Sequence, residues 1–214
     1  MKTLPRLICF SALVSLFAAV GPAVAEETEF TIGPDYADAP ETKARPDVPQ
    51  GKVLEFTMDS KDSAIYPGIA KNQKGTVPYQ RKVAVFVPAQ YQPGDEVPFI
   101  VAQDGLGYRG VLPVVLDNLI HEKRLPVMVA IMINSGGGDA QGSQRGLEYD
   151  TVSETYSKFI EQEVLPKISK DYQIRFTTDP EGRATMGGSS GGAAAFTMAW
   201  FHPELYRKVL TYSG

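Results

Sequence analysis

One short glycine-rich segment carries the residue types that nucleophilic catalysis needs. The run Met186-Gly187-Gly188-Ser189-Ser190-Gly191-Gly192 places two adjacent serines between glycines. A serine on a sharp turn between a strand and a helix has an exposed hydroxyl, and the residues two positions before and after it must be small. The amide after such a serine points toward the negative charge that develops during acyl transfer. The spacing therefore predicts a nucleophile elbow.

Two serines satisfy this spacing, so the motif by itself leaves the nucleophile open. Ser189 and Ser190 each have a glycine two positions before and two positions after. A phosphate-binding loop fits less well, because its motif ends in Gly-Lys-Ser/Thr and this segment has no lysine. A dinucleotide-binding turn also fits poorly, since no acidic residue ends the next strand. A turn that only connects two elements is the remaining alternative.

A serine nucleophile also needs a general base, usually histidine, and an acid that orients the base. In elbows of this kind both groups follow the serine in the chain. His202 is the only histidine after Ser189, and His121 lies earlier. We expect both to have surface or helix-terminal roles, and Glu204 to be misplaced for the acid. The acid and base are therefore expected beyond residue 214, and this chain alone is expected to be nearly inactive.

The elements that would position the elbow alternate in type. From about residue 95 the order is strand, helix, strand, helix, strand, helix, strand. Right-handed crossovers then predict an α/β fold, a mostly parallel sheet with helices on both faces. Two earlier strands are expected to add an antiparallel edge. Strands are predicted at 52–58, 82–87, 98–102, 126–134, 183–186 and 209–212, and helices at 112–120, 149–170 and 193–201.

The N-terminus has the composition of a secretory signal peptide. Lys2 and Arg6 precede the short apolar run 7–20, and Ala23-Val24-Ala25 has the small-x-small pattern of a cleavage site. The apolar run is shorter than the ~20 residues of a membrane span, which leaves an uncleaved anchor as the alternative. We therefore predict a secreted or periplasmic bacterial protein with no stable membrane insertion after cleavage.

The rest of the chain divides into two parts. Residues 26–50 are rich in Pro, Glu, Asp and Ala and predict an extended or disordered lead-in, whereas residues 51–214 form one domain. Cys9, the single cysteine, lies in the signal segment, so the mature chain has no disulfide or cysteine-based zinc site. No basic stripe indicates a nucleic-acid partner. The sequence implies no metal, nucleotide or flavin cofactor, and it carries no signal for an oligomeric state.

Residues from about 51 to 214 resemble the Putative esterase family of α/β-hydrolases. That family includes enterochelin esterases, feruloyl esterases, S-formylglutathione hydrolases and mycolyltransferases. The stretch 187–214 resembles the family's elbow, following helix, Pro-Glu turn and next strand without a gap. Weaker landmarks are Phe-Val-Pro-Ala-Gln-Tyr at 86–91, Gln-Asp-Gly at 103–105 and Arg-Gly-Leu-Glu-Tyr-Asp at 145–150. The resemblance implies an α/β-hydrolase fold that lacks its last strands in this chain.

The resemblance also implies roles for individual residues. The family pattern G-x-S-x-G-G favours Ser189 over Ser190 as the nucleophile. The backbone N–H groups of Leu106 and Ser190 are then the implied oxyanion donors. The loop that carries Leu106 begins with Gln103, Asp104 and Gly105, which are candidates for the substrate cleft. For Asp104 we favour a bracing role, in which its carboxylate bonds to local amides.

Arg145 and Glu148 lie on a loop that is expected to reach the same edge of the sheet. Two interpretations are equally open for them. They form an ion pair that shapes the substrate cleft, or they form a solvated surface pair that contributes little.

The function implied by the resemblance is hydrolysis of a carboxylic ester through an acyl-enzyme. The substrate would be a small-molecule or carbohydrate ester, and an acceptor alcohol in place of water would give acyl transfer. The competing hypothesis is a non-catalytic binding protein on a hydrolase scaffold, directed to carbohydrate, because a fold does not determine a function.

Export should remove the first 25 residues. We expect N-terminal sequencing of the exported protein to begin at Glu26. Ala25→Leu should slow or block this cleavage, because the signal peptidase accepts only small residues there. Glu26→Gln is the matched control and should be cleaved normally. An exported protein that retains residues 1–25 would contradict the signal-peptide interpretation.

Overall fold

The structure is a computed structural model, which describes residues 33, 35–72 and 74–214. The predicted signal peptide therefore lies outside the described residues. The chain divides into two units, residues 1–37 and residues 38–214, and the second unit contains every helix and strand described below. Of the predicted lead-in, residues 38–50 contact the domain: Asn118 Nδ2 donates hydrogen bonds of 2.8 and 2.9 Å to the carbonyl oxygens of Glu41 and Lys43.

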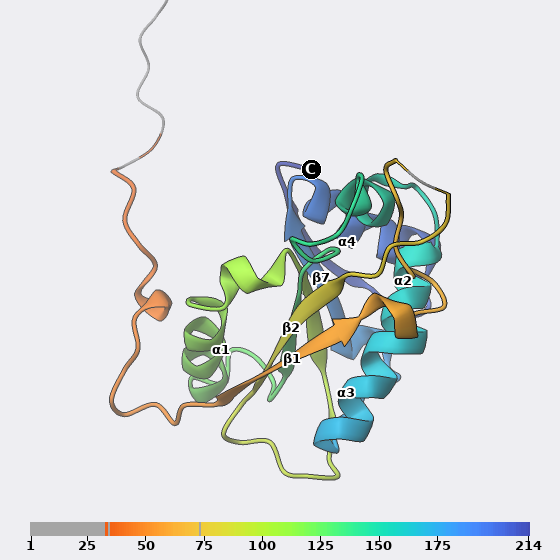
Figure 1. Cartoon of the computed structure of the whole chain (residues 1–214). Coiled ribbons are helices and arrows are strands. Elements are labelled where there is room, and N and C mark those ends of the chain that lie inside the picture. The colour runs from red at the N-terminus through yellow and green to blue at the C-terminus, as the bar shows by residue number, and fades with distance from the viewer. Residues whose placement is uncertain (1–32, 34, 73) are drawn as a thin grey trace, which may run out of the picture. The chain divides into compact units, whose positions relative to one another are not determined.

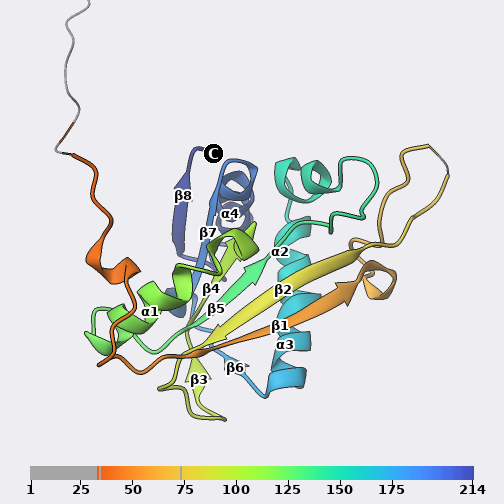
Figure 2. The same cartoon turned by 60° about the vertical axis from the view of Figure 1, so that its left-hand side comes forward.

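A six-stranded mixed sheet organises the second unit (Figures 1 and 2). The strand order is β1-β2-β5-β4-β7-β8, with β1 and β2 antiparallel and the other four strands parallel to one another. This arrangement confirms the predicted parallel sheet with an antiparallel edge. The strands are β1 (Lys52–Asp59), β2 (Gln80–Val87), β4 (Phe99–Gln103), β5 (Val129–Ile133), β7 (Arg183–Gly188) and β8 (Lys208–Tyr212).

Helices cover both faces of the sheet, as Figure 2 shows. The central strand β5 illustrates why its sequence is apolar throughout. Ile131 and Ile133 pack in the core cluster that contains residues of α2, α3 and α4, whereas Ala130 and Met132 pack in the cluster that contains residues of α1. Parallel strands buried on two faces need apolar residues at every position. The helices are α1 (Leu112–His121), α2 (Thr155–Phe159), α3 (Leu165–Tyr172) and α4 (Ser190–Phe201).

The helix predicted at 149–170 is broken into several pieces. Gly146–Asp150 forms one π-helical turn, and a second π-helical turn, Ile160–Val164, joins α2 to α3. Pro166 lies at the start of α3. A proline has no backbone N–H and crowds the preceding turn, so a widened turn just before it relieves the clash. The apolar spacing predicted one continuous helix, because the spacing continues across this break.

The structure also contains a two-stranded sheet that was not predicted from the sequence. β3 (Glu96–Val97) and β6 (Arg175–Phe176) pair in parallel, and Arg175 Nη2 lies 3.0 Å from Glu96 Oε2. Two-residue strands are too short to show an alternating pattern, so no local signal was available.

All parallel strands end at one edge of the sheet, and the antiparallel pairing brings the start of β2 to the same edge. Asp104 follows β4, Asn134 follows β5 and Ser189 follows β7. In open α/β sheets this carboxyl edge is where ligands bind. The fold therefore brings the predicted site residues to one edge.

The turn after β4 packs directly on the backbone of β5. A Cβ atom on Gly105 would lie 2.5 Å from the backbone nitrogen of Ile133 and would also contact the Met132 backbone. We expect Gly105→Ala to lower the free energy of unfolding by about 1–3 kcal/mol, because overpacking displaces the backbone. Urea unfolding measures this change.

Gly107→Ala is the matched control for Gly105→Ala. Gly107 lies in the same 3₁₀ turn, Gly105–Tyr108, and a Cβ atom there would meet nothing within 4 Å. Its effect should stay within about 0.5 kcal/mol. Equal destabilisation by the two variants would show that the contact with β5 is not the constraint.

Candidate active site

The chain reverses sharply at Ser189, between β7 and α4. Ser189 has φ 53° and ψ −133°, whereas Ser190 is the first residue of α4. A positive φ in a residue other than glycine is strained and usually marks a functional position. Ser189 is exposed and Ser190 is half-buried. The backbone therefore distinguishes the two serines that the spacing left equivalent.

The glycines around Ser189 allow two backbone segments to touch. A Cβ atom on Gly187 would contact the carbonyl group of Gly191 and lie 2.9 Å from the backbone nitrogen of Gly192. A Cβ atom on Gly192 would lie 2.6 Å from Thr211 Oγ1. No larger residue fits in these places without moving β7, β8 or the first turn of α4.

Two backbone hydrogen bonds fix the ends of the reversal. The N–H of Ser189 donates to the carbonyl oxygen of Tyr212 at 3.1 Å, and the N–H of Ala193 donates to the carbonyl oxygen of Ser189 at 3.0 Å. The first bond ties the elbow to β8, and the second begins α4. The free amides and positive end of this helix therefore lie beside the Ser189 hydroxyl, where they favour negative charge.

Gln103 does not line a cleft, which corrects the sequence prediction. It is the last residue of β4 and is fully buried. In the amide orientation that matches its neighbours, its nitrogen donates to the carbonyl oxygens of Met186 and Val101. The side chain therefore links β4 to β7 beneath the elbow.

Asp104 lies next to the elbow and pairs with Arg145. Its Oδ2 is 2.7 Å from Arg145 Nη2, and it lies 3.2 Å from where a Cβ atom on Gly191 would be. The hydrogen bond to Asp104 raises the pKa of Arg145, so the guanidinium stays charged. Asp104 thus braces the site through its ion pair with Arg145. Its carboxylate was expected to accept hydrogen bonds from local amides, and Arg145 takes their place. Asp104 also has a positive φ of 53°, and its N–H donates to Tyr149 Oη at 3.1 Å.

The predicted oxyanion donor Leu106 has a protein partner in this structure. Its N–H donates to Asn134 Oδ1 at 3.2 Å. The prediction required a free amide, and the Leu106 amide is not free in this structure. The Asn134 side-chain oxygen thus occupies the one donor position of the Leu106 amide.

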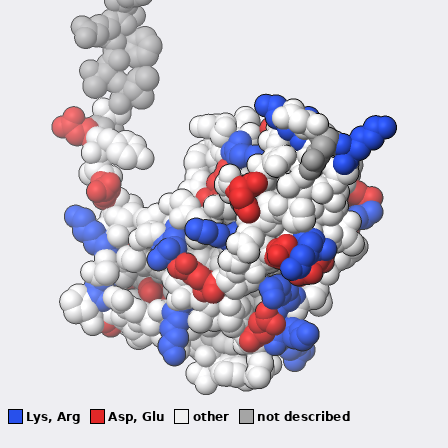
Figure 3. All heavy atoms as spheres, viewed as in Figure 1, with Lys and Arg blue, Asp and Glu red and all other residues white. Residues whose placement is uncertain are grey.

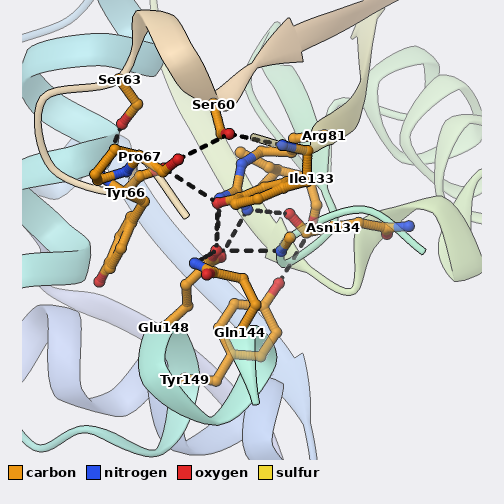
Figure 4. A network of polar contacts seen from close by, with 12 residues as sticks. Ser60, Ser63, Tyr66, Pro67, Arg81, Ile133, Asn134, Gln144, Glu148 and Tyr149 are labelled. Carbon is orange, nitrogen blue, oxygen red and sulfur yellow. Dashed lines mark hydrogen bonds and ion pairs between the residues drawn. The ribbon is translucent and has the colours of Figure 1, made fainter. Parts of the chain in front are cut away.

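Neither interpretation of Arg145 and Glu148 was right, because the two residues do not pair with each other. Glu148 is buried and forms an ion pair with Arg81, in which Arg81 Nη2 lies 2.6 Å from Glu148 Oε1 (Figure 4). The exposed fractions of the two side chains are 3% for Arg81 and 0% for Glu148. A charged pair with so little solvent is stable only when its hydrogen bonds are satisfied.

Glu148 meets that condition through four neighbours. Arg81 donates from both terminal nitrogens, and Tyr79 Oη, Gln144 Nε2 and the N–H of Gly136 donate at 3.0, 2.6 and 3.2 Å. Burial disfavours the charge of Arg81, but the hydrogen bonds and charge of Glu148 outweigh burial and raise the pKa of Arg81. The network fastens the loop after β5 to the start of β2.

Neither histidine can act on Ser189. His121 is the last residue of α1. His202 caps the far end of α4, where its Nδ1 lies 2.7 Å from Glu204 Oε1. The twelve residues of α4 separate His202 from Ser189 by roughly 18 Å at 1.5 Å per residue. A general base must lie within hydrogen-bond reach of the hydroxyl.

A polar cleft of about 340 Å³ opens at this edge of the sheet. It begins at Asp104, passes Asn134 and the glycine loop 136–138, and reaches Lys82 on β2. No sequence pattern indicates Lys82, Asn134 or Arg81, because strand pairing alone brings these residues to the cleft and the buried pair. Among the residues that the structure describes, no cluster of His, Cys, Asp or Glu side chains could hold a metal ion.

Residues 75–214 match the model of the family described as "Putative esterase". The chain belongs to the Putative esterase family. This confirms the resemblance that the elbow and its neighbouring motifs indicated. A search of curated proteins found no match.

Solved structures similar to this esterase-family chain share its fold. An enterobactin esterase from Shigella flexneri is 22% identical with a TM-score of 0.54, and the match covers 81% of this chain and 39% of that one. A ferric enterobactin esterase from Salmonella typhimurium is 21% identical with a TM-score of 0.59, over 78% and 37% of the two chains. A ferulic acid esterase from Anaeromyces mucronatus is 14% identical with a TM-score of 0.56, over 81% and 62%.

These comparisons confirm the α/β-hydrolase fold. The chain spans 39% and 37% of the length of the two enterobactin esterases and 62% of the ferulic acid esterase. At these identities the similarity concerns the fold.

The buried pair predicts an asymmetric response to substitution. Glu148→Gln should lower the free energy of unfolding by about 3–5 kcal/mol, because it leaves the Arg81 charge buried without a counter-charge. Asp171→Asn is the control, since it removes an exposed pair in which Asp171 Oδ2 lies 2.8 Å from Lys167 Nζ. That change should cost no more than about 0.5 kcal/mol. Chemical unfolding of both variants measures the difference, and similar losses would contradict a structural role for the buried pair.

Proposed function

We propose that this protein is a secreted serine carboxylic-ester hydrolase that forms an acyl-enzyme on Ser189. The observation that carries the proposal is the strained, exposed backbone of Ser189 at the start of α4. Such strain persists only when surrounding structure enforces it, and here it presents a hydroxyl at the carboxyl edge of the sheet. Ser190 has no comparable strain and serves through its backbone.

The oxyanion is proposed to bind between two amides. The N–H of Ser190, in the first turn of α4, is one donor, and the helix dipole adds to its effect. The N–H of Leu106 becomes the second donor if the ester oxygen displaces Asn134 Oδ1, which now occupies it at 3.2 Å. The exchange replaces one acceptor by another, so the Leu106 amide is hydrogen-bonded before and after binding.

The reaction requires a base that removes the proton from Ser189 Oγ as this oxygen attacks the ester carbonyl. The alcohol leaves with that proton, and water then releases the acid from the serine. Neither His121 nor His202 is placed for this role. Since the chain spans less than two thirds of the similar esterases, we propose that the base and its orienting acid lie beyond residue 214.

The proposed substrate is a small-molecule or carbohydrate ester. The similar structures include an enterobactin esterase and a ferulic acid esterase. An acceptor alcohol in place of water would give acyl transfer at the same elbow. Export to the periplasm or medium is proposed from the N-terminal sequence. No helix in the described part of the chain is both long and apolar enough to cross a membrane.

The competing proposal is a non-catalytic binding protein. Two observations favour it: the Leu106 amide already has a partner, and both histidines are distant from Ser189. Both proposals use the same edge of the sheet, so a test must detect activation of the serine itself.

A fluorophosphonate probe distinguishes the two. We expect the protein expressed from its complete coding sequence to be labelled, and Ser189→Ala to abolish labelling. Ser190→Ala is the matched control and should retain at least about a tenth of the rate, because Ser190 contributes only a backbone N–H. Mass spectrometry of the labelled peptide identifies the modified serine. Absence of labelling in the folded wild-type protein would favour the binding protein, and labelling of Ser190 would overturn the assignment of the nucleophile.

A further inference from the structure

The polar cleft beside the elbow contains an unusual distribution of charge. Its wall includes two carboxylates, Asp104 and Asp139, and one amine, Lys82. Figure 3 shows basic and acidic side chains mixed over the face that it presents. The electrostatic attraction of one unpaired charge is therefore mainly short-range. The partners of each charged group in the cleft therefore decide what the cleft can bind.

The carboxylates near Lys82 form ion pairs or accept hydrogen bonds elsewhere, but the partner of Asp139 is a backbone N–H, which supplies no counter-charge. Asp59, opposite Gln80 on β1, pairs with Lys61 at 3.3 Å. Asp104 pairs with Arg145 at 2.7 Å, and Asp139 accepts hydrogen bonds from the Gln80 N–H at 3.3 and 3.2 Å. Glu55 lies on the adjacent strand β1, and it pairs with Arg109 at 2.9 Å.

Lys82 differs from these carboxylates in how its charged group is placed. It lies opposite Thr57 in the β1–β2 pairing, is exposed, and contributes to the cleft wall. Its amine makes no ion pair or hydrogen bond with any residue that the structure describes. An unpaired lysine in a concave polar site attracts an anion more strongly than one on a flat surface, because the cleft limits screening by water.

We propose that Lys82 binds a negatively charged group of the substrate, a carboxylate or a phenolate, in this cleft. The proposal rests on the proposed esterase function, since it assigns the cleft to the same substrate that Ser189 attacks. β2 lies three strands from β7 in the order β2-β5-β4-β7, which is roughly 14 Å at about 4.8 Å per strand. The charged group of the substrate therefore lies far from the ester bond that Ser189 attacks. It contributes to substrate recognition and not to the chemical step.

The size and lining of the cleft are consistent with such a group. About 340 Å³ is within the usual range for a small-molecule site, ~300–1,000 Å³. A Cβ atom on Gly138 would meet nothing within 4 Å, so the glycine loop leaves the wall open at that point. Asn134 and Ser135 line the same cleft and supply neutral polar groups. The cleft thus combines the amine of Lys82 and neutral polar groups with two carboxylates, of which Asp104 is paired with Arg145 and Asp139 accepts hydrogen bonds from the Gln80 N–H.

The test uses two small probes that differ in charge. 4-(Trifluoromethyl)benzoate and the neutral 4-(trifluoromethyl)benzamide are titrated separately into the protein expressed from its complete coding sequence, and ¹⁹F NMR measures each dissociation constant. We expect the benzoate to bind at least about fivefold more tightly than the benzamide, and higher salt to reduce this preference. Lys82→Met should remove the preference, whereas Lys82→Arg should keep it.

Lys52→Met is the matched control, because Lys52 is also an exposed lysine of the β1–β2 pair but lies at its opposite end, across from Val87. It should leave the preference unchanged. Equal binding of the two probes to wild type, or a preference that survives Lys82→Met, would overturn the proposal.

Fluorophosphonate labelling of the same samples separates this proposal from the esterase assignment. Labelling at Ser189 without a preference for benzoate would remove the role of Lys82 and leave the esterase function. A preference for benzoate without labelling would leave an anion site and remove the serine mechanism.

Discussion

The close contact of two backbone segments, at Gly187 and Gly191, is the constraint on which the site depends. The end of β7 and the first turn of α4 leave no room for a side chain at Gly187. The chain must therefore reverse within Ser189, which takes φ 53° and ψ −133°. Strain of this kind costs on the order of 1–3 kcal/mol, so surrounding bonds must hold it. The hydrogen bond from the Ser189 N–H to Tyr212 is one of them.

The loops around the elbow are held by side chains of one short motif, residues 145–150. Arg145 pairs with Asp104, Tyr149 accepts the Asp104 N–H, and Glu148 fixes the loop after β5 through Arg81. Burial raises the pKa of Tyr149, so its hydroxyl keeps the proton that it donates to the carbonyl oxygen of Ile133 at 3.4 Å while it accepts the Asp104 N–H. These residues support the carboxyl edge of the sheet. A rigid edge keeps the amides of the proposed oxyanion site in place before substrate arrives.

The family and the elbow were accessible from sequence because both depend on short-range rules. The steric limits of a strand-to-helix turn require small residues at fixed offsets from a serine, and those offsets are visible in the chain. The apolar run at β5 likewise predicted a strand, and the structure shows that this strand is buried on both faces. The break before Pro166 was missed because the apolar spacing continues across it. The two-residue strands β3 and β6 were missed because they are too short to show any apolar spacing.

The sequence by itself determined the alternation of strands and helices and the glycine spacing, which limited the candidates for a nucleophile to two neighbouring serines. Only the tertiary structure decided which serine carries the strain and which partner each charged group has. Glu148 was expected to pair with Arg145 and is buried against Arg81, and the Leu106 amide was expected to be free and is bound to Asn134. Turn sterics act over a few residues, whereas these pairings join positions 67 and 28 residues apart. Distances of that kind are set by strand register and helix packing, which no local pattern encodes.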